Sequence, residues 1–145
     1  MDSKAHHLFI AVLFFFVMPP MARAQADVAG SKDYPLFSRW PGYYINTYDH
    51  KKFDAYTYYL KDGQETVEGE RYHLMYYCKQ GVEPASELEI IRNYENAIRK
   101  AGGTVLYTQG KSFTVGKIVK EGKEVWVRAS WANYGSVIVL DIVER

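Results

Sequence analysis

The chain has 145 residues, with 18 lysines and arginines against 17 aspartates and glutamates, so its formal net charge at pH 7 is +1. Proteins that bind nucleic acids usually carry a clustered basic excess, because neutralising phosphates dominates their affinity. This balance argues against nucleic acid as a partner. No stretch has the spacing of a phosphate-binding loop, and no cofactor is predicted.

The first 24 residues have the order of a secretory signal peptide. A lysine and two histidines precede an apolar run over 8–18, and a motif of the form Ala-x-Ala ends at Ala24. The apolar run is too short to cross a bilayer, which takes about 20 residues. Cleavage is expected after Ala24, with Ala26 as the alternative. The protein is therefore predicted to be exported, to the periplasm of a Gram-negative bacterium or beyond, with no membrane span after cleavage.

The remaining residues, 25–145, have the length of a single domain. They contain one cysteine, Cys78, so no intrachain disulfide can form and the core must hold the fold alone. We interpret Cys78 as a small buried apolar residue. The alternative is a disulfide between two chains, and the oligomeric state is left open.

An irregular N-terminal arm is predicted over 25–42. Beyond it, strand-favouring residues alternate with period two. The pattern predicts seven strands, at Tyr43 to Thr47, Phe53 to Leu60, Glu70 to Cys78, Thr104 to Thr108, Ser112 to Lys120, Glu124 to Trp131 and Ser136 to Val143. The last strand is apolar on both faces and is placed in the centre of the sheet. In the third strand, the face with Leu74 and Tyr76 is predicted to meet the core.

Residues that favour turns lie between these strands. Glu121-Gly122-Lys123 and Asn133-Tyr134-Gly135 predict tight hairpins, which make the strands that they join antiparallel. Asp62-Gly63 is interpreted as a turn inside a longer connection.

One amphipathic helix is predicted over 86–101, in "SELEIIRNYENAIRKAGG". Ser86 and Glu89 form a capping box at its start, and Gly102 ends it. The stripe predicted to face the sheet is Leu88, Ile91, Tyr94, Glu95, Ile98 and Ala101. The fold class is therefore α+β, a curved antiparallel sheet of about seven strands with one main helix, in the order β-β-β-α-β-β-β-β.

No catalytic or metal site is predicted. The odd spacing of His73 and Cys78 places their side chains on opposite faces of a strand, which argues against a nucleophilic dyad. A metal site would need His50 to meet His73 and a carboxylate, and no local ligand spacing supports this. Glu68 and Glu70 are interpreted as a solvated strand edge rather than an acid/base pair.

Tyrosine is the compositional anomaly, with thirteen in the chain. The stretches "YYINTY" and "YTYYL" place tyrosines on both faces of their strands, so one set lies outside the core. Exposed tyrosines suit stacking on sugars or a protein interface, because each ring carries a polar group. The alternative, which we favour, is that the tyrosine rings cover a face of the sheet that is otherwise only half covered.

The stretch "GSKDYPLFSRWPGYYI", 30–45, can be interpreted in two ways. Pro35 and Pro41 restrict the backbone to extended shapes. The favoured interpretation is an arm that seals the sheet through three apolar anchors, Leu36, Phe37 and Trp40.

The alternative is a recognition surface. An arginine beside an aromatic ring can hold an anionic sugar or a peptide carboxylate, which makes Arg39 and Trp40 candidates for binding. Asp33 and Tyr44 are the further candidates. Under the sealing interpretation, Asp33 instead pairs with Arg39 at the rim of the arm.

Three stretches together resemble a known module: "GSKDYPLFSRWPGYYI", "IIRNYENAIRKAGGTVLY" and "GKEVWVRASWANYGSVIVLDIVE". They resemble the extracytoplasmic N-terminal module of bacterial OmpA-family proteins, over about Asp27 to Glu144. In that family a C-terminal OmpA-like domain binds peptidoglycan, and this chain stops at Arg145, so the residues for that function have no counterpart. The resemblance implies an envelope location and no chemistry of its own.

The leading expectation is a non-enzymatic domain of the cell envelope that binds an envelope protein or glycan, or serves structurally. Its contact surface would be an aromatic face or an exposed strand edge. The alternative is a small hydrolase of cell-wall or extracellular polymer, with carboxylates that only the fold brings together. A third possibility is that the domain acts beside a separately encoded OmpA-like partner.

Overall fold

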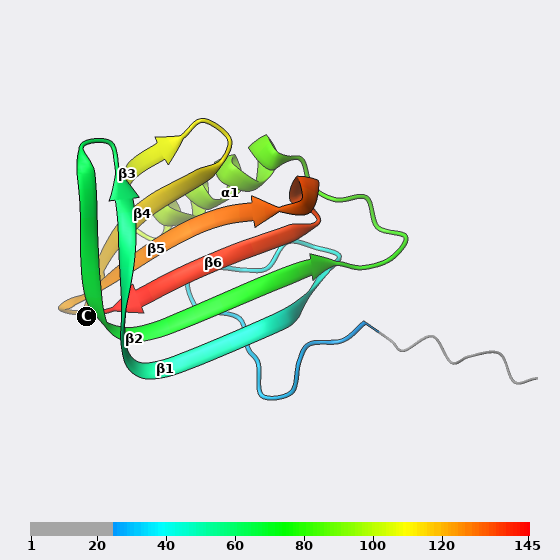
Figure 1. The fold of residues 1–145 in the computed structure, drawn as a ribbon, viewed down its shortest axis with the longest axis horizontal. Coiled ribbons are helices and arrows are strands. Elements are labelled where there is room, and N and C mark those ends of the chain that lie inside the picture. The colour runs from blue at the N-terminus through cyan, green and yellow to red at the C-terminus, as the bar shows by residue number, and fades with distance from the viewer. Residues whose placement is uncertain (1–24) are drawn as a thin grey trace, which may run out of the picture.

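The computed structural model describes residues 25–145, and the predicted signal peptide lies outside the described residues. Its elements are β1 (Tyr43–Leu60), β2 (Gly63–Cys78), α1 (Glu87–Lys100), β3 (Thr104–Gln109), β4 (Phe113–Lys120), β5 (Lys123–Ala132), the short 3-10 turn η1 (Asn133–Gly135) and β6 (Val137–Glu144). The strands form one six-stranded antiparallel sheet in the order β1-β2-β6-β5-β4-β3 (Figure 1). The α+β class is confirmed, and β6 lies centrally as predicted.

The prediction of seven strands was wrong because its first two strands are continuous in β1. Residues 49–53 are exposed on both sides, so they lack the alternation that marks a half-buried strand. The pairing of β1 with β2 shifts register between Lys51 and Asp54. β2 begins at Gly63, which pairs with Leu60, so Asp62 lies in a two-residue hairpin turn rather than in a longer connection. The observed order is therefore β-β-α-β-β-β-β.

The β1–β2 hairpin bends sharply, and its far end, residues 55–68, turns across one end of the sheet (Figure 1). We call this part the distal hairpin. Gly69 stands at the bend, where an added Cβ would overlap the carbonyl oxygen of Glu144. The hydroxyl of Tyr58 donates to the carbonyl oxygens of Trp126 and Asp141, at 3.1 and 3.3 Å. A small core lies under the distal hairpin, formed by Tyr58, Val67, Phe113, Val115, Trp126 and Val143.

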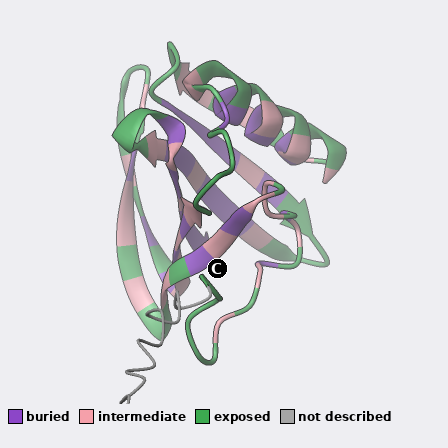
Figure 2. Cartoon of the chain, turned by 90° about the vertical axis from the view of Figure 1, so that its right-hand side faces the viewer, coloured by how far each residue is buried: buried purple, intermediate pink, exposed green. Residues whose placement is uncertain are grey.

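The helix packs on the opposite face, over β3, β4 and β5. The predicted capping box is confirmed: Ser86 Oγ accepts from the N–H of Glu89, whose carboxylate accepts from the N–H of Ser86. Gly102 has a φ of 83°, which suits the predicted helix end. Figure 2 shows buried and exposed positions alternating along α1. The predicted stripe was wrong at Leu88, which faces an open hollow in the first turn, while Ile90 is buried.

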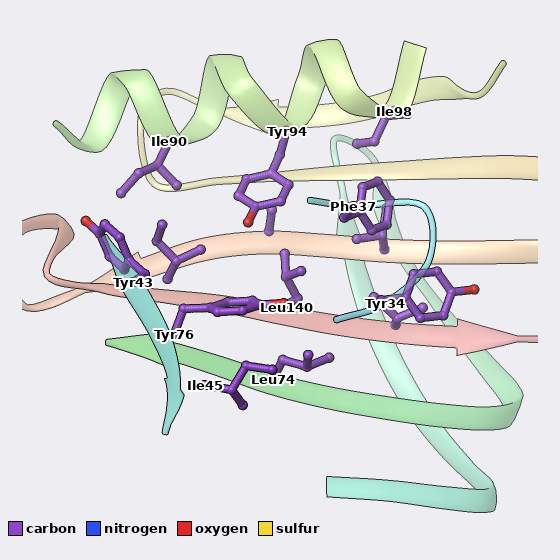
Figure 3. Packing of buried hydrophobic residues seen from close by; sticks show 14 of the residues in the cluster. Tyr34, Phe37, Tyr43, Ile45, Leu74, Tyr76, Ile90, Tyr94, Ile98 and Leu140 are labelled. Atoms are coloured by element: carbon purple, nitrogen blue, oxygen red, sulfur yellow. The ribbon is translucent and has the colours of Figure 1, made fainter. Parts of the chain in front are cut away.

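The N-terminal arm covers the part of this inner face that the helix leaves free (Figure 3). Phe37 is 1% exposed, and its ring meets that of Tyr94 edge-on at 6.2 Å between centroids. Tyr34 is also buried, and its hydroxyl donates to a carboxylate oxygen of Glu144. The main core therefore lies between the sheet and a second layer made of helix and arm. Leu74 from β2 is fully buried in it, as predicted.

No helix within residues 25–145 combines the length and the apolar character that crossing a membrane requires.

Candidate functional site

The face of the sheet opposite the helix, which we call the outer face, is only half covered by the distal hairpin. Across its middle, one register row carries ionisable side chains on four strands. Arg128 on β5 lies opposite Asp141 on β6, Asp141 lies opposite His73 on β2, and His73 lies opposite Asp49 on β1. Side chains opposite one another in a sheet are neighbours, so this row forms a polar strip across the outer face.

Asp141 is the centre of this row and is 5% exposed. Its Oδ1 lies 2.7 Å from Nδ1 of His73 and 3.7 Å from a terminal nitrogen of Arg71. Arg71 also donates to Asp54 at 3.1 Å. A carboxylate that is removed from water needs such partners to remain ionised. Burial, reinforced by the nearby charge of Asp141, raises the pKa of Tyr56 above its usual value.

Arg128 differs from Arg71 because no carboxylate within residues 25–145 lies within ion-pair distance of it. Its guanidinium lies 4.6 Å from the centre of the Phe113 ring, and one terminal nitrogen donates to Ser130 Oγ at 2.8 Å. The aromatic contact holds the planar group in place, while its remaining N–H groups are free to donate to a ligand.

The described residues of the row do not bring His73 together with a serine nucleophile. The hydrogen bond to Asp141 leaves only Nε2 of His73 for a ligand. The oxygen of Ser130 accepts a hydrogen bond from Arg128, and it lies two strands from His73, roughly 10 Å at ordinary strand spacing. A base and a nucleophile must be in hydrogen-bond reach of one another. The arrangement therefore suits recognition of charge.

Two tyrosines extend the outer face away from the distal hairpin. Tyr44, a predicted binding residue, lies opposite Tyr77 on β2, with 6.2 Å between ring centroids. Both rings are half-buried. They place an aromatic pair on the same face as the polar row, four residues along β2 from His73. Aromatic and polar groups on one face are a combination that protein interfaces favour.

The other predicted binding residues belong to the arm, on the other side of the sheet. Arg39 donates through its two terminal nitrogens to Asp27, both at 2.8 Å, and through Nε to Asp33 at 3.0 Å. The hydroxyl of Tyr76 also donates to Asp33. The predicted pair of Asp33 and Arg39 is confirmed, and these contacts engage all three nitrogens of the guanidinium. Trp40 packs against the main core and is half-buried.

The two histidines lie in different surroundings. Nε2 of His50 is 2.6 Å from Glu70, and its ring stacks on that of Tyr72 at 4.4 Å. His73 faces the other side of the sheet, and Cys78 packs against the main core, so the predicted separation of His73 from Cys78 is confirmed. Among residues 25–145, no three His, Cys, Asp or Glu side chains gather in a way that suits a metal ion.

Sequence reasoning missed the polar row. The signal was present in "SVIVLDIVE", where Asp141 is the one charge inside a strand that is otherwise apolar on both faces. A buried carboxylate requires a cationic partner, so Asp141 indicates a basic side chain on a neighbouring strand. The identity of those partners depends on register, which the sequence does not supply.

No family model matches the chain, and no curated protein sequence matches it either. The resemblance to the OmpA-family module stays a prediction, and the function has to be inferred from the surfaces described above.

Proposed function

We propose that the protein is a non-enzymatic binding module of the bacterial cell envelope and that it contacts another envelope component through the outer face of its sheet. The observation that carries this proposal is Arg128, an arginine fixed on an aromatic ring with most of its donors open. Arginine and tyrosine are the residues that most often dominate binding energy at protein interfaces. The same face also carries two tyrosines, Tyr44 and Tyr77.

The partner is expected to present an anionic group, such as a carboxylate, to Arg128. A planar guanidinium binds a carboxylate through two parallel hydrogen bonds, which fix its orientation. The distal hairpin forms a wall at one end of the face, so the partner would approach from the end with Tyr44 and Tyr77. Export to the periplasm and kinship with the OmpA-family module belong to the same proposal.

The alternative function, hydrolysis by paired carboxylates, would need two carboxylates close together, and Glu70 with Glu144 is such a pair. Glu70 and Glu144 occupy opposite register positions on β2 and β6. Glu70 is held by His50 and by the hydroxyl of Tyr72, and these bonds lower its pKa below the usual value. A general acid in glycoside hydrolysis needs a raised pKa instead. The pair therefore favours a structural role at the bend, and binding remains the better supported function.

A retention experiment tests the proposal. The purified exported protein is mixed with insoluble peptidoglycan and with detergent-solubilised envelope extract, and the bound fraction is measured for the wild type, Arg128→Ala, Arg128→Lys and Arg99→Ala. Arg99 is an exposed arginine on the helix and serves as the matched control. We expect retention that Arg128→Ala abolishes, that Arg128→Lys weakens and that Arg99→Ala preserves. Thermal unfolding of each variant shows whether it is folded.

Two outcomes would contradict the proposal. Equal retention of Arg128→Ala and the wild type would exclude the outer face as the contact surface. Release of soluble fragments from the peptidoglycan by the wild type would favour the hydrolase instead.

A further inference from the structure

A groove of about 470 Å³ runs between the N-terminal arm and the outer side of α1. Residues 35–38 of the arm form one wall, and helix residues from Asn93 to Ala101 form the other. Pockets for small ligands usually measure about 300–1,000 Å³. The groove lies on the far side of the sheet from Arg128, so the proposed function makes no use of it.

Both walls of the groove are fixed before any ligand arrives. The arm is anchored by Phe37, buried against Tyr94, and by the ion pairs of Arg39 with Asp27 and Asp33. The helix is held at its start by the capping box and along its buried side by the main core. A preformed site avoids the entropy cost of ordering its walls when a ligand binds.

The polar side chains of the groove are uncommitted. Asn93, Asn96 and Lys100 follow one another along the same side of the helix, and Ser38 faces them from the arm. None of these four side chains hydrogen-bonds or forms an ion pair with another residue of 25–145, whereas all three guanidinium nitrogens of Arg39 have carboxylate partners. Each asparagine amide offers two donors and one acceptor.

The remaining lining is apolar and small, with Leu36, Ala97 and Ala101 among it. Carboxylates are missing from the lining, which argues against a cation as the ligand. Lys100 supplies a single positive charge, and it stands at the carbonyl end of the helix, where the helix dipole disfavours anions. The groove therefore combines neutral hydrogen-bonding groups with apolar surface.

We propose that this groove binds an uncharged oligosaccharide. A sugar ring has apolar faces formed by C–H groups and an edge of hydroxyls, so its faces would rest on Leu36 and the alanines while its hydroxyls bond to the amides. An N-acetyl substituent would pair with an asparagine amide in the same manner, donor to acceptor and acceptor to donor. The groove is open at its top, which suits a segment of a longer chain.

Titration followed by nuclear magnetic resonance tests this inference on the protein expressed as the full chain and purified after export. Three probes are compared: the tetramer of N-acetylglucosamine, cellotetraose, and a tetramer of galacturonic acid as the anionic counterpart. We expect saturable shifts of the backbone and amide signals of Ser38, Asn93 and Asn96 with a neutral tetramer, at a dissociation constant on the order of 1 mM.

Variants assign the binding to the groove. Removing one hydrogen-bonding amide should weaken the affinity of Asn96→Ala about 3- to 10-fold. Gln64→Ala removes an amide from the exposed end of the distal hairpin and should leave the affinity unchanged. Arg128→Ala should also bind the free tetramer normally. A dissociation constant on the order of 1 mM is too weak to hold the protein on washed peptidoglycan, so the groove and the proposed outer-face function can fail separately.

The inference would be overturned by any of three results: no saturable shift with either neutral tetramer at about 10 mM, where a millimolar site would be nearly full; binding of the galacturonic acid tetramer alone; or an affinity of Asn96→Ala equal to that of the wild type.

Discussion

The two faces of the sheet are closed to very different degrees. The inner face is covered by the helix and the arm, and its core cluster holds 17 buried residues, whereas the core under the distal hairpin holds six. Most of the hydrophobic stabilisation therefore lies on the inner face, because that stabilisation scales with the apolar area removed from water. Less apolar surface is buried on the outer face, which carries the polar side chains Arg128, Asp141 and His73.

The residues that stabilise the fold and the residues proposed to contact a partner therefore lie mostly on different faces of the sheet. On the inner face, Arg39 of the arm is paired with Asp27 and Asp33. On the outer face, Arg128 keeps donors free. Substitutions on the inner face should thus change unfolding more than binding, and the opposite should hold around Arg128.

The largest effect is expected for Phe37→Ala, which removes the arm's buried anchor. Truncating a buried phenylalanine costs about 3–5 kcal/mol, because the cavity adds to the lost burial. Urea unfolding followed by circular dichroism measures the change. Leu36→Ala, on the half-buried neighbour in the same arm, is the control and should cost clearly less. A loss for Phe37→Ala below about 1 kcal/mol would mean that the arm does not seal the inner face.

The next largest effect is expected at the bend of the hairpin. Gly69→Ala places a methyl group against the backbone of Glu144, and a backbone atom cannot move aside as a flexible side chain would. We expect a loss of about 3 kcal/mol in unfolding free energy, the upper end for overpacking. Glu68→Ala, at the exposed neighbouring position, should be nearly neutral. Equal stability of the two variants would show that the distal hairpin does not lie across β6.

The two faces also differ in how far the sequence predicts them. Local sequence signals predict much of the inner layer. They are the spacing of Ser86 and Glu89, the position of Gly102 and the prolines of the arm, and each acts within a few residues. Their consequences could be predicted, including the pairing of Asp33 with Arg39. These signals depend on backbone geometry that the neighbouring residues determine by themselves.

The outer face depends on contacts between distant residues, which no local pattern contains. The bend at Gly69 is needed because of Glu144, and the continuity of β1 through 49–53 is supported by pairing with β2 rather than by alternation. Likewise, Asp141 meets His73 and Arg71 only because β6 and β2 are neighbours in one register. A slip of β6 by one residue against β2 would move Asp141 to the other face, away from His73 and Arg71. The sequence therefore predicts the fold class, but it does not predict which side chains meet at the candidate site.

A smaller effect is expected for Tyr58→Phe, which keeps the ring but removes the hydroxyl that donates to Trp126 and Asp141. The loss should be about 1 kcal/mol, the usual net contribution of one intramolecular hydrogen bond. Thermal unfolding measures it, with Tyr59→Phe as the matched control, because that ring is 57% exposed. If both variants unfold at the wild-type temperature, the distal hairpin is held by apolar contact alone.

The smallest effect, and one that depends on pH, is expected at Asp27. Hydrogen bonds from Arg39, and a further one from the N–H of Ile45, outweigh burial and lower the pKa of Asp27 in the folded protein. A carboxyl whose folded pKa is depressed stabilises the fold above its unfolded pKa of about 3.9, and that contribution is lost as the pH falls through the lower folded value. The side chain is 37% exposed, so solvent screens the pair and the effect stays small.

The midpoint of thermal unfolding, measured from pH 7 down to about pH 2 for the wild type and Asp27→Asn, tests this sign. The wild type should be the more stable of the two near pH 7, and the difference should shrink as the solution is acidified below about pH 4. Asp62→Asn, in the exposed hairpin turn, is the control and should follow the wild type. A difference between wild type and Asp27→Asn that persists unchanged at the acid end would mean that the carboxylate's charge does not hold Arg39, and that the arm is fastened by Phe37 and its apolar neighbours alone.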